Sequence, residues 1–233
     1  MNAIREIMLS PDVLTLIGSI EQYATQSITV VRDKRLKPDQ GASFWQKNPE
    51  IRISSTGTTK DVVLHEVLHL ALRAYGFPTT FQATDRELFP ILRPIDNLLQ
   101  HHVMYRKFIA LGGNPSRFVC EKAIVDSKKC MQSLLKSPTP QNPATQFVFT
   151  TNSLIAMSPF YGYSDLEKSL IQKRITWVSS DFWDTWNTIT NDLGPERKFE
   201  GCFRRTSRLL GGNPSDIGGF IYITGKTLPW STW

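Results

Sequence analysis

The spacing of His65, Glu66 and His69 lets the three side chains act on one metal ion. Residues four apart share a face of a helix, so both imidazoles can bind the same zinc ion. Glu66 lies one step round the helix, close enough to reach a water on that ion and act as a general base. A catalytic zinc site usually has three protein ligands and one open position, so a third ligand must come from elsewhere in the chain.

The residues around this motif predict a helix over about 59–75. Apolar residues recur through the stretch at the spacing of a buried helix face. Thr58 or Thr59 can cap its start, and residues 76–78 (Gly-Phe-Pro) predict its end. The alternative is that the two histidines are ordinary helix residues with a glutamate between them by accident.

A second helix, predicted from Pro94 to about residue 108, carries the other two of the four histidines, His101 and His102. Either can supply the third ligand, and so can Asp96 on the same helix or Glu87 just before it. The alternative for the histidine pair is an ordinary place on the helix surface or in the core.

His101 is the preferred third ligand, because Asn97 one turn before it and Tyr105 one turn after it form a polar face. The Asn97 side-chain oxygen can accept the other N–H of a ligating histidine. Tyr105 is also a candidate to stabilise a developing oxyanion, and Tyr161 and Tyr163 are others. For each tyrosine, ordinary packing is the alternative.

The rest of the chain predicts an α+β fold. The expected elements before the motif helix are a helix over 11–25 and strands over 27–31 and 50–54. The expected later helices cover 117–136, 144–157, 164–174, 180–193 and 197–210. We therefore expect a small sheet packed on the motif helix, a second ligand helix, and a mostly helical C-terminal half. The predicted domains are a core over 1–116 and a helical region over 117–233 packed on it.

One hexapeptide, LGGNPS, occurs at residues 111–116 and again at residues 210–215. Gly-Gly followed by Asn-Pro is a signal for the end of a helix. The flanking residues do not match, so two similar helix ends are expected rather than a duplicated domain.

The net charge of +6 comes from 27 basic and 21 acidic residues. Basic residues cluster in 32–37 and in 204–208, where a solvated face is the expected explanation and an acidic partner the alternative. No nucleic-acid-binding motif is present, so nucleic acid is not an expected partner.

Three cysteines without a C-x-x-C pair predict buried thiols and a reducing compartment. Residues 1–8 include Glu6 and lack the apolar run of a signal peptide. No stretch approaches 18 apolar residues, so no membrane span is expected. A cytoplasmic protein is the expectation.

The motif and the small sheet before it resemble the zincin metallopeptidases over roughly residues 28–111. The metzincin continuation is absent, because Leu72 stands where its Gly would be and Tyr75 where its last His would be. The layout is most similar to the gluzincin type, in which a downstream helix supplies a Glu within E-x-x-x-D. This chain departs from that pattern, because Ile91 and not Asp lies four residues after Glu87.

The resemblance implies a zinc-dependent peptidase in which Glu66 is the general base and the substrate is a peptide or protein. The strand predicted just before the motif helix can also place a sheet edge beside the metal, to which an extended peptide can add as a strand, although the sequence does not show which edge is free. The alternative is a non-catalytic zinc-binding regulatory or protein-interaction module that keeps the zincin fold. The cleavage preference and the oligomeric state are not predicted.

Overall fold

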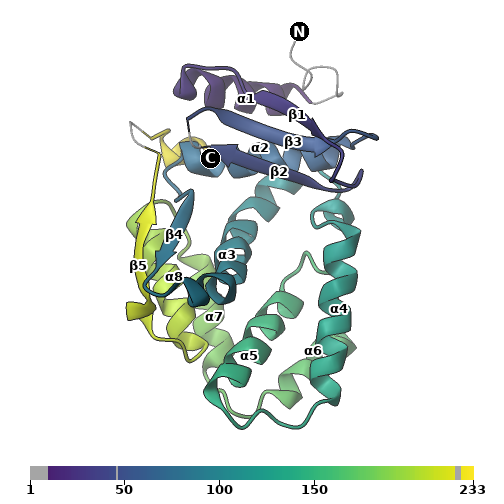
Figure 1. Ribbon diagram of the computed structural model, residues 1–233, viewed down its shortest axis with the longest axis vertical. Helices are drawn as coiled ribbons and strands as arrows, with labels where there is room; N and C mark the ends of the chain where they lie inside the picture. Colours follow the sequence, from purple (N-terminus) through teal and green to yellow (C-terminus); the bar gives the residue numbers. More distant parts are fainter. Residues whose placement is uncertain (1–9, 46, 224–226) are drawn as a thin grey trace. The chain divides into compact units, whose positions relative to one another are not determined.

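The computed structural model describes residues 10–45, 47–223 and 227–233 (Figure 1). The α-helices are α1 (Pro11–Ala24), α2 (Lys60–Ala74), α3 (Phe89–Ala110), α4 (Glu121–Lys136), α5 (Pro143–Met157), α6 (Asp165–Arg174), α7 (Phe182–Asn191) and α8 (Arg197–Leu209). The strands are β1 (Thr29–Asp33), β2 (Gly41–Trp45), β3 (Pro49–Ser54), β4 (Thr80–Ala83) and β5 (Ile217–Ile221). Short 3₁₀ helices are η1 (Arg86–Leu88), η2 (Pro115–Arg117), η3 (Pro214–Asp216) and η4 (Trp230–Thr232). The α+β class is confirmed, and the segment 1–8 considered above lies outside the described residues.

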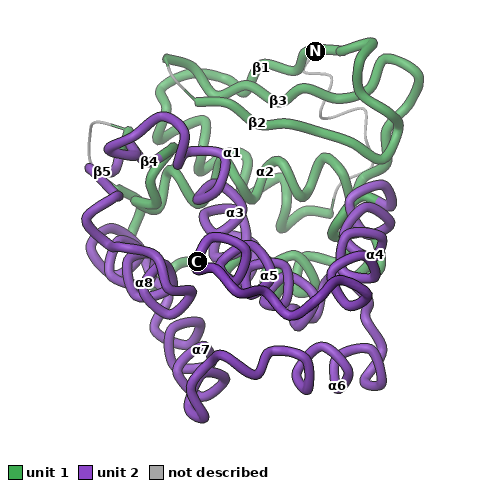
Figure 2. The backbone as a smooth tube through the Cα atoms, turned by 60° about the horizontal axis from the view of Figure 1, so that its bottom comes forward, with its two compact units in different colours: residues 1–80, 103–120, 221–233 green, residues 81–102, 121–220 purple. Residues whose placement is uncertain are grey.

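The chain forms two compact units, each built from several segments (Figure 2). The first contains residues 1–80, 103–120 and 221–233, and the second contains 81–102 and 121–220. Helix α3 is continuous, and its last part, from Val103, belongs to the first unit. The domain limits at residues 116 and 117 stay a prediction.

The first unit is built on a three-stranded sheet in the order β1-β3-β2. Strand β1 runs parallel to β3, whereas β2 runs antiparallel to it. Alternate residues of β3 face opposite sides, so Ile51 and Ile53 are buried while Glu50 and Arg52 pair outside at 2.7 Å. Helix α2 packs on β2 and β3, and α1 packs on α2, so both helices lie on one face of the sheet (Figures 1 and 2).

Helix α2 begins and ends at local signals close to those that the sequence predicts. The Thr59 hydroxyl accepts a hydrogen bond from the Val62 N–H at 3.4 Å. After Tyr75, Gly76 takes a left-handed conformation with φ 89°, which turns the chain away from the helix axis. Most of the residues between these ends are buried, and α2 is accordingly apolar around much of its circumference.

Helix α3 is longer than predicted, because it starts at Phe89 and continues through Pro94. The sequence predicts a new helix at Pro94, since proline has no N–H for the helix ladder. Pro94 lies in the second turn, where its ring removes one early hydrogen bond. Buried Leu92 and Ile95 on either side keep this turn packed.

Strands β2, β4 and β5 are absent from the sequence prediction. Residues 41–45 (Gly-Ala-Ser-Phe-Trp) contain no β-branched residue, and their extended form depends on pairing with β3. Strands β4 and β5 pair only with each other within the described residues and come from distant parts of the chain.

The second unit is mostly helical, and its five later helices match the predicted ranges within a few residues. Helices α4 and α5 pack together, as do α5 with α6 and α7 with α8. One core cluster contains Met131, Phe149, Tyr163 and Ile171, which come from α4, α5, the loop before α6, and α6. The mostly helical character of the C-terminal half is therefore confirmed.

Both LGGNPS segments form the same turn at the end of a helix. Gly112 after α3 and Gly211 after α8 have φ values of 83° and 84°. The side chains of Asn114 and Asn213 each accept a hydrogen bond from the N–H two residues on, at 3.1 and 3.0 Å. The prediction of two similar helix ends is confirmed.

Two chemical expectations can be compared with the structure directly. The cysteines are free, but Cys202 alone is buried, Cys120 is partly exposed and Cys130 is exposed, so the prediction of three buried thiols is wrong. Among the described residues, no helix has both the length and the apolar character needed to cross a bilayer.

Candidate metal centre

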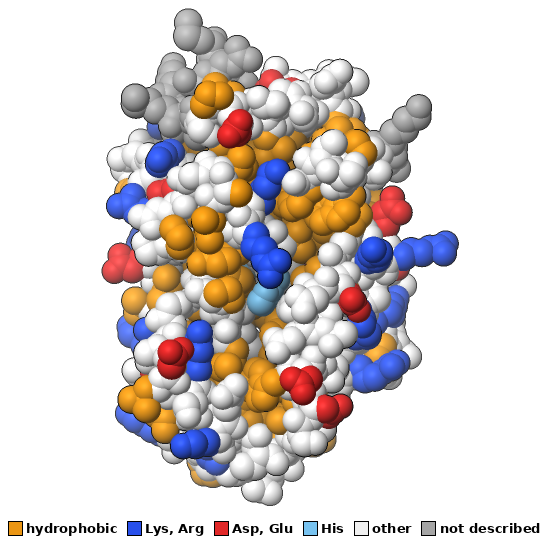
Figure 3. Space-filling view, turned by 180° about the vertical axis from the view of Figure 1, so that it is seen from behind, with side chains coloured by type: hydrophobic (Ala, Val, Ile, Leu, Met, Phe, Trp, Pro, Cys, Tyr) orange, Lys and Arg blue, Asp and Glu red, His pale blue; other side chains and the backbone are white. Residues whose placement is uncertain are grey.

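His65 and His69 lie on the same side of α2, with ring centroids 4.9 Å apart and ring planes at 67°. This is the arrangement that a spacing of four residues produces on a helix. Both side chains are partly exposed. The space-filling view shows a face of the molecule on which a histidine reaches the surface among hydrophobic and basic side chains (Figure 3).

His65 is held by Phe118, in the segment that follows α3. The two rings are 4.9 Å apart, and the Phe118 carbonyl accepts a hydrogen bond from a ring N–H of His65. Burial lowers the pKa of His65 to about 4, although this hydrogen bond acts in the opposite direction. His65 is therefore neutral at pH 7, which is the form that binds a metal.

Helix α3 lies beside Phe118. Tyr105 and Phe108 of this helix each pack on the Phe118 ring, with ring centroids 5.1 Å apart. His101 is four residues before Tyr105 on this continuous helix and shares its face. It is buried, with 5% of its surface exposed. One ring nitrogen from each of His65, His69 and His101 lies within 4.8 Å of the other two.

Glu66 lies beneath β2, and its residue is 6% exposed. Burial raises the pKa of Glu66 to about 7, while a hydrogen bond from the Ser43 side chain and the positive charge of Arg73 act in the opposite direction. Arg73 also donates a hydrogen bond to the Ser43 carbonyl at 3.3 Å. The carboxylate therefore lies between α2 and an edge strand, in surroundings that favour proton uptake near neutral pH.

We expect this raised pKa to affect stability in the metal-free protein. Glu66 binds a proton more tightly when folded, so its contribution to stability is complete below its unfolded pKa of about 4 and is lost as the pH rises through about 7. Glu66→Gln removes the charge, so at pH 8 it should raise the free energy of unfolding by about 3 kcal/mol, and by nearly nothing at pH 4. Urea unfolding at the two pH values measures this, and an equal effect at both would contradict it.

Strand β2 comes close to Glu66 because residue 41 is a glycine. A Cβ on Gly41 would lie 2.7 Å from the Glu66 Cγ and 3.0 Å from the Val62 Cγ1. We expect Gly41→Ala to lower the free energy of unfolding by about 1–3 kcal/mol through overpacking. Gly18→Ala in α1 is the control, because a Cβ there meets nothing within 4 Å and should raise stability by up to about 1 kcal/mol. Equal effects in thermal unfolding would show that the contact with Glu66 is unimportant.

The alternative third ligands lie in other surroundings. His102 Nε2 is 3.2 Å from the buried Ser158 hydroxyl, and the His102 ring packs on Phe160. Asp96 accepts two hydrogen bonds from the Gln100 amide, each at 3.1 Å. Glu87 is exposed in η1.

The structure also shows the surroundings of Asn97 and of the three tyrosines considered as oxyanion stabilisers. Asn97 is exposed, and no hydrogen bond of its side chain is found in the part of the chain that the structure describes. Tyr105 packs on Phe118 and Tyr161 on Phe160. Tyr163 is buried and shares a hydrogen bond of 3.0 Å with Ser127, so it is a core residue.

Sequence reasoning missed three groups that touch the motif: Gly41, the Ser43 hydroxyl and the Phe118 carbonyl. The last is a backbone group and leaves no signal in the residue types. No family model, curated protein or solved structure matches this chain.

Proposed function

We propose that this chain is a zinc-dependent peptidase in which His65, His69 and His101 hold the metal and Glu66 is the general base. The observation that carries the proposal is that ring nitrogens of the three histidines lie within 4.8 Å of one another, and that two of these histidines are on the helix that also carries Glu66. His101 is the third ligand because it alone of the four candidates belongs to this group.

The donor set fits zinc. Imidazole nitrogens bind zinc at about 2.0–2.1 Å, so two of them in a tetrahedral site are about 3.3 Å apart. The nitrogens of His65, His69 and His101, within 4.8 Å of one another, would have to come closer to bind one ion. Three protein ligands also leave a fourth position open, as a catalytic site requires. When bound, zinc supplies a Lewis acid that polarises a carbonyl and lowers the pKa of water to about 7.

Glu66 then carries out the two proton transfers of the reaction. Glu66 takes a proton from the attacking water as the water oxygen bonds to the carbonyl carbon of the peptide. It passes that proton to the amide nitrogen as the C–N bond breaks, which leaves a carboxylic acid and an amine. The Ser43 hydroxyl and Arg73 favour the ionised form of Glu66 that starts this sequence.

A peptide substrate can bind as an added strand along β2. Within the described residues this strand pairs with β3 alone, so its other edge has backbone groups available for an extended peptide. Gly41 and Ser43 of β2 lie against Glu66. A chain paired to this edge would therefore pass close to the general base. The free cysteines agree with the expected cytoplasmic location, which stays part of this proposal.

The test is cleavage of a diverse peptide mixture, followed by mass spectrometry of the products. We expect cleavage by the zinc-loaded protein, none after zinc is removed with a chelator, and recovery when zinc is returned. Cleavage that survives chelation would refute a metal-dependent mechanism. Zinc binding without cleavage of any peptide or protein offered would favour the non-catalytic zinc-binding module.

A further inference from the structure

A buried carboxylate in the first turn of α2 holds the segment that follows α3. Asp61 is 3% exposed, and its Oδ1 accepts a hydrogen bond from the Asn114 N–H at 3.0 Å. Its Oδ2 lies 4.0 Å from the Arg117 guanidinium. A buried carboxylate is costly unless it is paired, so these partners account for Asp61 at a position where most side chains are apolar.

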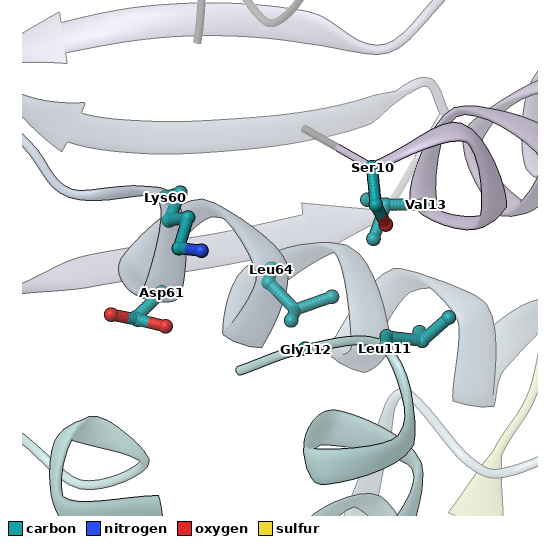
Figure 4. A pocket seen from close by; sticks show the side chains of 7 residues that line it. All are labelled: Ser10, Val13, Lys60, Asp61, Leu64, Leu111 and Gly112. Carbon is teal, nitrogen blue, oxygen red and sulfur yellow. The ribbon is translucent and has the colours of Figure 1, made fainter. Parts of the chain in front are cut away.

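The junction also borders a pocket. A cavity of about 90 Å³ borders it, and Asp61, Leu64, Leu111 and Gly112 are among the residues that line it (Figure 4). The hydrogen bond from the Asn114 N–H joins the turn to the first turn of α2.

From Asn114 the chain has little freedom before it reaches Phe118. The Asn114 side chain accepts hydrogen bonds from the Ser116 N–H at 3.1 Å and the Ser116 hydroxyl at 2.9 Å. Residues Pro115–Arg117 form the single turn of η2, and Phe118 follows directly. A short, hydrogen-bonded segment therefore connects Asp61 to Phe118, so a shift at Asp61 should also move Phe118.

Phe118 is where this segment meets the candidate metal centre. It is 2% exposed, its ring packs on His65 and Tyr105, and its carbonyl accepts the His65 N–H. An acceptor on one imidazole nitrogen determines which nitrogen carries the proton and how the ring is oriented toward a metal.

We propose that Asp61 is a positioning residue for the metal ligand His65, acting through the 114–118 segment and the Phe118 carbonyl. This inference rests on the proposed zinc site. The partners of Asp61 are Asn114 and Arg117, so its effect on the site is indirect and would change the affinity and geometry of metal binding.

The second LGGNPS segment provides a matched control. Asn213 makes the same side-chain hydrogen bond to the N–H two residues on as Asn114 does. The η3 turn that follows, Pro214–Asp216, leads into β5 and not to a histidine. Loss of either asparagine side chain should have a similar local cost, and only Asn114 should affect the metal.

The test measures Zn²⁺ affinity by competition with a chromophoric chelator for wild type, Asp61→Ala, Asp61→Asn, Asn114→Ala and Asn213→Ala. We expect Asp61→Ala and Asn114→Ala to weaken binding by about 10–100-fold, as outer-shell changes do, and Asn213→Ala to leave it unchanged. Asp61→Asn keeps an oxygen that can accept the Asn114 N–H, so it should retain most of the affinity. The visible spectrum of bound Co²⁺ should shift in the same variants that lose affinity.

Thermal unfolding of the metal-free variants separates this effect from misfolding, because Asn114→Ala and Asn213→Ala should melt alike. Zinc affinity unchanged in Asp61→Ala and Asn114→Ala, with wild type binding zinc normally, would overturn the positioning role and leave the zinc site intact. A wild-type protein that binds no zinc would instead refute the proposed function.

Discussion

The Glu66→Gln variant is expected to bind zinc within about twofold of wild type and to cleave peptides about a hundred- to ten-thousandfold more slowly, the range that general acid–base catalysis contributes. The amide keeps the size of the side chain and can still meet Ser43. It cannot take up the proton of the attacking water. If Glu66→Gln cleaves slowly but still binds zinc, the lost activity is due to proton transfer and not to metal binding.

Two measurements check this expectation: kcat/KM on one peptide found in the cleavage screen, and Zn²⁺ affinity by competition. Glu50→Gln is the control, because Glu50 lies on the outer face of the sheet and pairs with Arg52. It should leave both quantities near the wild-type values. A Glu66→Gln variant that cleaves at the wild-type rate would exclude Glu66 as the general base.

Replacement of His101 by Ala is expected to weaken zinc binding by at least about a hundredfold, since zinc sites gain about 10–16 kcal/mol in total from a few ligands. The adjacent His102→Ala variant should keep zinc affinity within a few fold. The two histidines are neighbours in sequence, yet His101 belongs to the three-histidine group whereas His102 lies against Ser158. They therefore form a natural pair for comparison.

Zinc affinity of both variants, with far-UV circular dichroism to confirm folding, measures this difference. Because His101 is buried, His101→Asn is a second variant that leaves a smaller void than Ala and should lose zinc as well. The third ligand would be misassigned if zinc survives both His101 variants and is lost with His102→Ala, Asp96→Ala or Glu87→Ala.

Features with local causes could be predicted from the sequence. The start of α2 depends on the Thr59 hydroxyl and the Val62 N–H, three residues apart, and its end on Gly76. The common face of His65 and His69 follows from helix geometry alone. The two LGGNPS turns likewise form from groups within a few residues of one another.

Features that depend on distant parts of the chain could not be predicted from the sequence. Strand β2 is extended because it pairs with β3, and the residue types of 41–45 do not indicate this pairing. Pro94 is a local signal to begin a helix, and packing along α3 overrides it. The contacts of Ser43 with Glu66 and of Phe118 with His65 join segments more than 20 residues apart, and the latter uses a backbone carbonyl.

Three arginines of the two basic clusters interact with groups of the same chain. Arg35 pairs with Asp33 at 2.7 Å, and Arg205 pairs with Asp192 at 2.9 Å. Arg204 donates hydrogen bonds to the carbonyls of Pro214 and Ile217.

A zinc ion held by three histidines can be detected directly by X-ray absorption at the zinc edge of the protein loaded with one equivalent of zinc. We expect a tightly bound ion with three imidazole ligands at about 2.0–2.1 Å and one oxygen ligand, and a spectrum altered in His101→Ala. A spectrum of fully hydrated zinc, or one with sulfur ligands, would contradict the account.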